Sequence, residues 1–256
     1  MNVVVNISLG QVAAALTLVV VAIVVARWRE TDLERDIGIA VVRSFIQLLA
    51  IGYLIQLIFD EDNLLFVFAL IAAMVAFGAY TARSRASAVP GAMLPLVVAL
   101  SLAAVTTLGL VLALGIFEPE ARFLVPVGGM VVGNAMTASA VALDRLGHEF
   151  EQGSAQIEAT LALGATARQA ALPAVQRSLR AGTITLIDST KTTGLIFFPG
   201  TMVGMLLAGA DPVDAVRLQL ILLYVLLGAI SISALVATSM AYRNFFTPAQ
   251  QLRELE

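Results

Sequence analysis

The chain contains no cysteine, one histidine and one lysine among 256 residues, and only 13% of its residues are charged. The absence of cysteine excludes disulfides, thiolate metal sites and cysteine nucleophiles. The single histidine, His148, stands in a polar segment, so a tight transition-metal site is poorly supported. Soluble domains carry about a quarter charged residues, and this composition excludes an ordinary one. The chain also has no basic tail or nucleic-acid module, so we expect no nucleic-acid partner.

Long apolar runs fill most of the chain. A helix that crosses the hydrocarbon core needs about 20 apolar residues. We therefore expect an all-α polytopic membrane protein with about seven transmembrane helices, in contact with lipid and folded as one domain over residues 1–256. The first run has no positive charge before it and is too long for a signal-peptide core, so we expect it to be retained. The expected spans are Val3–Ala26, Ile37–Phe59, Leu64–Thr81, Gly91–Phe117, Phe123–Leu143, Thr183–Leu207 and Val216–Tyr242.

The arginines predict the orientation, because basic residues near the ends of spans stay on the cytoplasmic side. Eleven arginines fall in alternate connections and the C-terminal tail, against two in the opposite connections. We expect a multi-pass protein of the plasma (inner) membrane, with its N-terminus outside and its C-terminus in the cytoplasm. The same rule places the longest polar interval, Asp144–Arg180, in the cytoplasm.

This cytoplasmic loop (about residues 144–182) is long enough to touch a partner. Within it, Ala155–Ala171 is rich in good helix formers and predicts a short amphipathic helix interrupted at Gly164. We expect Ser154 to be the N-cap and Pro173 to end the segment. One interpretation is a helix that lies on the membrane surface. The other is a docking element.

The docking interpretation comes from a resemblance. Glu158-Ala159, then Gly164, then Leu172-Pro173 is similar to the cytoplasmic "EAA" loop of ABC-transporter permeases. In that group the loop forms a coupling helix that docks in a cleft of the ATP-binding subunit. The spacing from Gly164 to Leu172-Pro173 is shorter than in importers, so the importers' docking geometry does not transfer in detail. The resemblance implies ATPase-coupling residues, which are Glu158, Ala159, Gly164, Arg168 and Pro173.

Motifs along nearly the whole chain resemble the FetB-type iron-export ABC permease family. They are Arg43-Ser44-Phe45-Ile46-Gln47-Leu48, Gly133-Asn134-Ala135-Met136, Asp188 to Leu195, Phe198-Pro199-Gly200-Thr201-Met202 and Leu207 to Pro212. The resemblance implies a homodimeric permease that exports iron, driven by a separate ABC ATP-binding subunit. Plant members of this family are linked to aluminium tolerance, so a cargo other than a metal stays open.

The energy source must lie outside this chain if ATP drives it. A phosphate-binding loop of the type G-x-x-x-x-G-K-[ST] needs a lysine after a glycine. The only lysine, Lys191, follows Thr190. We therefore expect a transport subunit without catalytic residues or a cofactor of its own, with ATP and Mg bound by the partner.

Two charges interrupt the sixth expected span. Asp188 and Lys191 stand three residues apart on one helical face, where each costs about 2.5–3.5 kcal/mol at the centre of a membrane helix. They form either a structural ion pair or part of the substrate route. Arg43 and Gln47, one turn apart on the second span, approach the same region or reach the membrane surface instead.

The sixth span should also be broken, because Pro199 removes a backbone hydrogen bond and Gly200 loosens the helix. Met202 lies just beyond the break, where a thioether either packs or binds a soft metal. On the fifth span, Gly129 and Gly133 predict close helix approach or a homodimer seam, and Asn134 adds a polar group. We expect any metal to meet weak, oxygen-rich ligands, or to travel as a complex, and leave the metal ligands unassigned.

Two other function classes compete with an ABC permease. A secondary transporter coupled to an ion would use Asp188 and Lys191, although the sequence shows no convincing inverted repeat. An intramembrane enzyme lacks support, because the chain has no H-E-x-x-H motif, no membrane histidine and no cysteine. An ABC permease for a metabolite that is not a metal also stays open.

Overall fold

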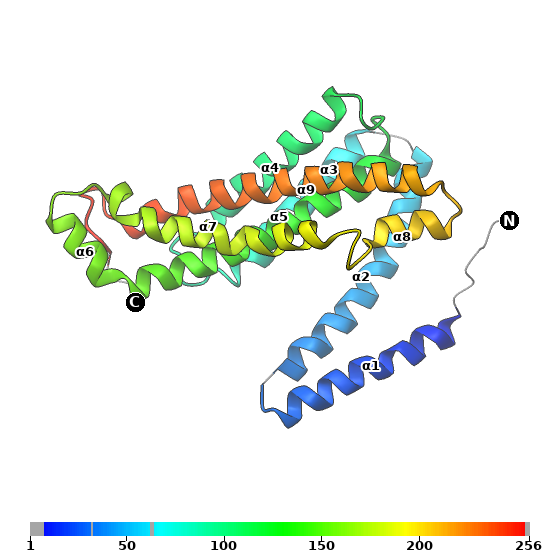
Figure 1. Cartoon of the computed structure of the whole chain (residues 1–256), viewed down its shortest axis with the longest axis horizontal. Helices are drawn as coiled ribbons and strands as arrows, with labels where there is room; N and C mark the ends of the chain where they lie inside the picture. Colours follow the sequence, from blue (N-terminus) through cyan, green and yellow to red (C-terminus); the bar gives the residue numbers. More distant parts are fainter. Residues whose placement is uncertain (1–7, 32, 62–63, 254–256) are drawn as a thin grey trace. The chain divides into compact units, whose positions relative to one another are not determined.

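The computed structural model describes residues 8–31, 33–61 and 64–253 (Figure 1). These residues form α-helices and one short 3-10 helix, and the described ranges contain isolated β-bridges but no β-sheet. The all-α prediction is therefore confirmed. The helices are α1 (Leu9–Trp28), α2 (Leu33–Glu61), α3 (Leu64–Arg83), α4 (Met93–Ala113), α5 (Ala121–Gln152), α6 (Ser154–Ala162), α7 (Ala167–Thr192), α8 (Gly200–Leu207), α9 (Pro212–Ala241) and η1 (Tyr242–Phe245).

The chain divides into two compact units. The first contains α1, α2 and residues 204–211, and the second contains residues 63–203 and 212–256. In the first unit α1 contacts α2, and Ser8 begins α1 through a capping box with Gln11. Ala26 is the one buried side chain among those described from residue 8 to residue 53. Apolar side chains on such helices suit a lipid environment. The single domain over residues 1–256 stays a prediction.

Helix α5 is the centre of the second unit, since it contacts α3, α4, α7 and α9 (Figure 1). Alanines dominate the buried positions, and side chains without accessible surface include Ala99, Ala103, Ala135, Ala142, Ala234 and Ala237. Small side chains let helix backbones approach closely, which is how helices associate where the surrounding solvent is itself apolar. Larger side chains such as Leu96, Leu100 and Leu143 fill the space between the close contacts.

The closest contact between α5 and α7 lies at Gly182. A Cβ added there would lie 2.5 Å from the backbone oxygen of Ala138 and 2.8 Å from the Cβ of Ala142. Only glycine fits this crossing. The predicted pair on α5 behaves differently, because a Cβ at Gly133 would meet nothing within 4 Å and one at Gly129 would lie 3.9 Å from Met74. The neighbouring Gly128 has less space, because a Cβ added there would lie 3.1 Å from Cγ1 of Ile71.

Six helices are long and apolar enough to cross a membrane within the described ranges, and they match six of the expected spans: α1, α2, α3, α4, α5 and α9. The expected span Thr183–Leu207 is instead divided between α7 and α8. Helix α7 ends at Thr192, Gly194 adopts φ +84°, and a bridge joins Thr193 to Phe197 before α8 begins. The predicted break therefore exists, and it starts before Pro199.

We expect Gly182→Ala to destabilise the second unit by about 1–3 kcal/mol, because the new methyl group has no room against the Ala138 carbonyl. Gly133→Ala is the matched control, since it makes the same change on the facing helix where space is open. It should be neutral or stabilising by about 0.5–1 kcal/mol, because alanine favours a helix over glycine. Thermal unfolding of both purified variants in detergent measures this. Equal melting temperatures would contradict the close crossing.

Candidate functional site

The expected docking element is a helical hairpin that projects beyond α5. Gly153 joins α5 to α6, and its N–H donates to the backbone oxygen of Glu149. The prediction that Ser154 caps α6 is wrong, because Gly153 occupies the N-cap and the Ser154 hydroxyl donates to the backbone oxygen of Glu151. A Cβ at Gly153 would lie 2.7 Å from the Glu149 oxygen, so this junction has no room for the serine type of cap.

The turn between α6 and α7 is exposed. Gly164 adopts φ +89°, which favours glycine, and Leu163 beside it is 90% exposed. Thr166 then begins α7 through a capping box with Gln169. The predicted interruption at Gly164 is therefore confirmed. The other predicted docking residues, Glu158, Ala159, Arg168 and Pro173, are exposed on the same hairpin.

The prediction that Pro173 ends the segment is wrong. Pro173 is the seventh residue of α7, and the helix continues to Thr192. The helix survives because its opposite face packs, with Ala170, Ala171, Ala174 and Ser178 buried. Tertiary packing thus outweighs the missing hydrogen bond, which at Pro173 would have run to the backbone oxygen of Gln169.

The C-terminal segment packs beside this hairpin, which the sequence did not reveal. Phe245 stacks on Phe150 of α5 with ring centroids 4.1 Å apart, and Phe246 meets the same ring edge-on. Beyond them, the Ala167 N–H at the start of α7 donates to the Gln250 side-chain oxygen, at 3.1 Å. The paired aromatics after the last span were the available signal for this contact.

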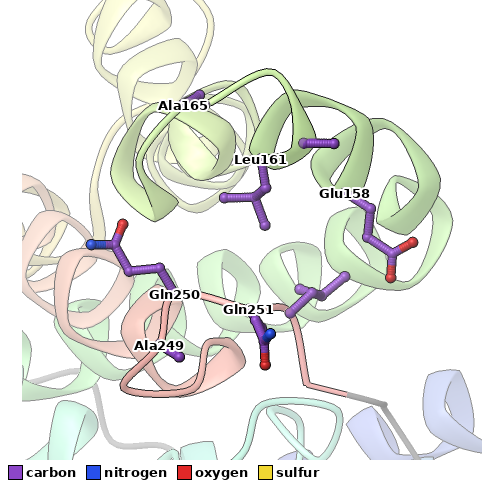
Figure 2. Close-up of a pocket in the computed structure, with 9 residues that line it drawn as sticks. Glu158, Leu161, Ala165, Ala249, Gln250 and Gln251 are labelled. Atoms are coloured by element: carbon purple, nitrogen blue, oxygen red, sulfur yellow. The ribbon is translucent and has the colours of Figure 1, made fainter.

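A groove of about 470 Å³ separates α6 from the C-terminal segment (Figure 2). Leu161 points into this space, and Glu158 lies at its rim (Figure 2). Among the described residues that line it, Glu158 is the one with a charge, and the set is Glu158, Leu161, Ala162, Gly164, Ala165, Ala249, Gln250, Gln251 and Leu252. The hairpin and the tail therefore form one continuous surface with a recess.

An ion cluster lies beneath the hairpin. The Glu149 side chain is 10% exposed, and each of its oxygens is within 2.6 Å of an arginine. Arg145, one turn earlier on α5, pairs with Oε1. Arg177 of α7 donates from Nε to Oε2, and its Nη2 lies 2.6 Å from the same oxygen. The sequence placed these residues in one loop but could not show that they meet.

The second candidate region is the far half of α7. Asp188 and Lys191 pair at 2.9 Å, and their side chains are 59% and 65% exposed in the single chain. The nearby threonine hydroxyls are satisfied within the helix, as Thr190 donates to the Leu186 backbone oxygen and Thr192 to that of Asp188. The structure thus brings the predicted pair together on an accessible face of a helix rich in polar residues.

The remaining predicted route residues are distributed over both units. Asn134 donates to the Met130 backbone oxygen within α5, Met202 is buried, and Pro199 and Gly200 stand at the start of α8. Arg43 and Gln47 belong to the first unit, where they line a shallow groove along α2 with Gly38, Ile39, Val42 and Ile46. Among the described residues, no group of three or more histidine, aspartate or glutamate side chains could hold a metal ion.

Comparison with known proteins places these features in a family. A family model described as "Uncharacterised protein family (UPF0014)" matches residues 9–246. "Protein ALUMINUM SENSITIVE 3" of Arabidopsis thaliana is 38% identical over 94% of this chain and 88% of its own length. "UPF0014 membrane protein STAR2" of Oryza sativa subsp. japonica is 36% identical over 94% of this chain and 85% of its length.

A bacterial relative bears directly on the resemblance seen in the motifs. "Probable iron export permease protein FetB" of Escherichia coli (strain K12) is 34% identical over 96% of this chain and 95% of its own length. The resemblance to FetB-type proteins is therefore confirmed. No solved structure shows significant similarity to the chain.

We expect Gln250→Ala to loosen the start of α7, because the Ala167 N–H loses its acceptor from the tail. The loss should be about 0.5–1.5 kcal/mol, the net value of one hydrogen bond. Hydrogen exchange at residues 167–170 should speed up accordingly. Gln251→Ala is the control, since its side chain makes no hydrogen bond in the described ranges. Unchanged exchange in Gln250→Ala would show that the tail does not hold this helix end.

Proposed function

Because the chain belongs to the UPF0014 family, we propose that it is the membrane-spanning permease subunit of an ABC exporter whose ATP-binding subunit is a separate chain. The main supporting observation is the exposed hairpin of α6 and the start of α7. From this hairpin, α7 continues as one polar helix to Thr192. A relative covering nearly the whole chain is named as a probable iron export permease, which supports iron as the cargo. A permease for a metabolite that is not a metal is the alternative within this class.

The hairpin has the features of a docking element. Leu163 at the tip of the hairpin is 90% exposed, and the groove beside α6 offers a recess. In the proposed orientation, the N-terminus lies outside and the C-terminus inside, so the hairpin and the tail both face the cytoplasm. There the ATP-binding subunit, which binds ATP and Mg, would dock.

Helix α7 supplies the proposed route. Beyond the expected cytoplasmic interval 144–182, its residues 183–192 rise about 15 Å at 1.5 Å per residue, so α7 enters about half of the hydrocarbon core. Helix α7 is not among the helices that are long and apolar enough to cross a membrane. A polar helix at membrane depth is stable only against protein or water, so we place its exposed face toward a central cavity shared with a second copy of the chain. The non-helical segment 193–199 fits the same location, since irregular backbone is tolerated where it lines a cavity.

The test of this function is reconstitution with an ATP-binding subunit in lipid vesicles. Cross-linking in the same preparation should give a permease homodimer. ATP should drive Fe²⁺ movement across the membrane, and Gly164→Val should uncouple it, because valine disfavours the positive φ of the docking turn. ATP-driven movement should fall by about tenfold, a typical coupling between sites. Glu158→Arg should act in the same direction.

Glu118→Lys is the matched control for these variants, because it reverses an exposed charge in the connection before α5. It should leave ATP-driven movement unchanged. Movement of Fe²⁺ that follows an ion gradient and ignores ATP would overturn the ABC proposal and favour an ion-coupled secondary transporter. ATP-driven movement of a metabolite, without any metal, would retain the ABC proposal and replace the cargo.

The ion pair on α7 gives a second test. If Asp188 and Lys191 each contact cargo in the route, Asp188→Asn and Lys191→Met should each reduce transport, and the double variant should be at least as impaired as either single one. A merely structural pair would behave in the opposite way, because removing both charges leaves neither unpaired. Recovery of transport in the double variant would therefore remove these residues from the route. The exposed ion pair between Asp188 and Lys191 should contribute little to the free energy of unfolding.

A further inference from the structure

The Glu149 cluster joins two helices that the chain separates by the whole hairpin. Glu149 belongs to the last turns of α5, and Arg177 lies 28 residues later on α7. Arg177 uses two nitrogens on one carboxylate oxygen, while Arg145 occupies the other oxygen. The Glu149 side chain is largely buried, while the Arg145 and Arg177 side chains that pair with it are about half exposed. Charge-assisted contacts of this kind are among the strongest polar links between helices.

The position of this link along α7 is informative. Pro173 lies four residues before Arg177, and it removes the hydrogen bond that would join it to the Gln169 carbonyl. The first part of α7, residues 167–172, is therefore less rigidly connected to the rest of the helix than an unbroken ladder would allow. The link to Glu149 attaches on the far side of that weak point, to the part of α7 that continues to Asp188 and Lys191.

Helix α6 rests against the same place. Ile157 is its one buried side chain, and it lines a small cavity of about 70 Å³ together with Glu149, Pro173 and Arg177. The α5–α6 junction at Gly153 has little freedom, because its N–H donates to the Glu149 backbone oxygen. A push on α6 therefore reaches Glu149 through the backbone junction at Gly153, beside the cavity that Ile157 and Glu149 both line.

We propose that Glu149 and Arg177 are positioning residues that carry movement of the docking hairpin past Pro173 into the part of α7 that lines the route. This inference rests on the proposed function and deepens it. The pair acts as a fixed link between α5 and α7, and its removal lets the hairpin move while the far half of α7 stays in place. Nucleotide hydrolysis then continues without productive transport.

The experiment measures cargo moved per ATP hydrolysed, with the permease and its ATP-binding subunit in vesicles. Glu149→Gln keeps the shape and removes the charge, and Arg177→Lys keeps the charge but loses the planar two-nitrogen contact. Each should lower the ratio by about fivefold or more, while ATP hydrolysis itself persists. Glu118→Gln is the matched control, since it makes the same change at an exposed pair with Arg122, and it should leave the ratio unchanged.

A cross-linking rescue separates positioning from stability, because the chain has no native cysteine. Glu149→Cys with Arg177→Cys should be uncoupled as free thiols, and a short bifunctional thiol reagent that joins them should restore the ratio. Neither single cysteine variant should respond to the reagent. A lowered melting temperature with an unchanged ratio, or a failure of the cross-link to restore it, would overturn the inference alone. Absence of ATP-driven transport in the unmodified chain would overturn the proposed function first, and this inference with it.

Discussion

The close crossing of α5 and α7 is the contact on which the second unit depends. At Gly182 the two backbones meet without an intervening side chain, and this distance sets where everything beyond it can lie. The same approach brings Arg177 within reach of Glu149 and lets α6 fold back over both helices. In an apolar solvent the hydrophobic effect does not drive helices together, so packing between small side chains has to do so. The alanines and glycines at these contacts therefore hold the helices together.

Apolar runs were sufficient to predict most helices, because length and composition decide whether a segment can cross a bilayer. They were insufficient for α7. Hydrophobicity predicted one span over Thr183–Leu207, but α7 ends at Thr192, before Gly194 with its positive φ. Pro173 misled for a related reason. A rule about local backbone geometry predicts a helix end, whereas the buried alanines on the opposite face keep the helix intact.

The candidate docking residues could be found from motif spacing, and the structure adds the parts that spacing cannot supply. Glu158 and Gly164 belong to a motif that the sequence shows. The groove beside them is also lined by Gln250 and Leu252 of the C-terminal segment, which the motif does not include. Contacts between segments 80 or more residues apart leave no periodic trace in one sequence, as the Ala167 to Gln250 hydrogen bond illustrates with its separation of 83 residues. The Glu149 cluster is hidden similarly, since acidic and basic residues abound in any polar loop.

The folded C-terminal segment also governs how the protein can be handled. Arg253 donates from its backbone to the Phe245 carbonyl and from its side chain to the Phe246 carbonyl, so the segment is held in place as far as this residue. An affinity tag or fluorescent fusion attached directly after Arg253 would lie near the residues that line the recess beside α6. Such a label would compete sterically with whatever approaches the hairpin. Under the proposed function, preparations labelled at this end would then bind the ATP-binding subunit poorly because the label blocks the hairpin.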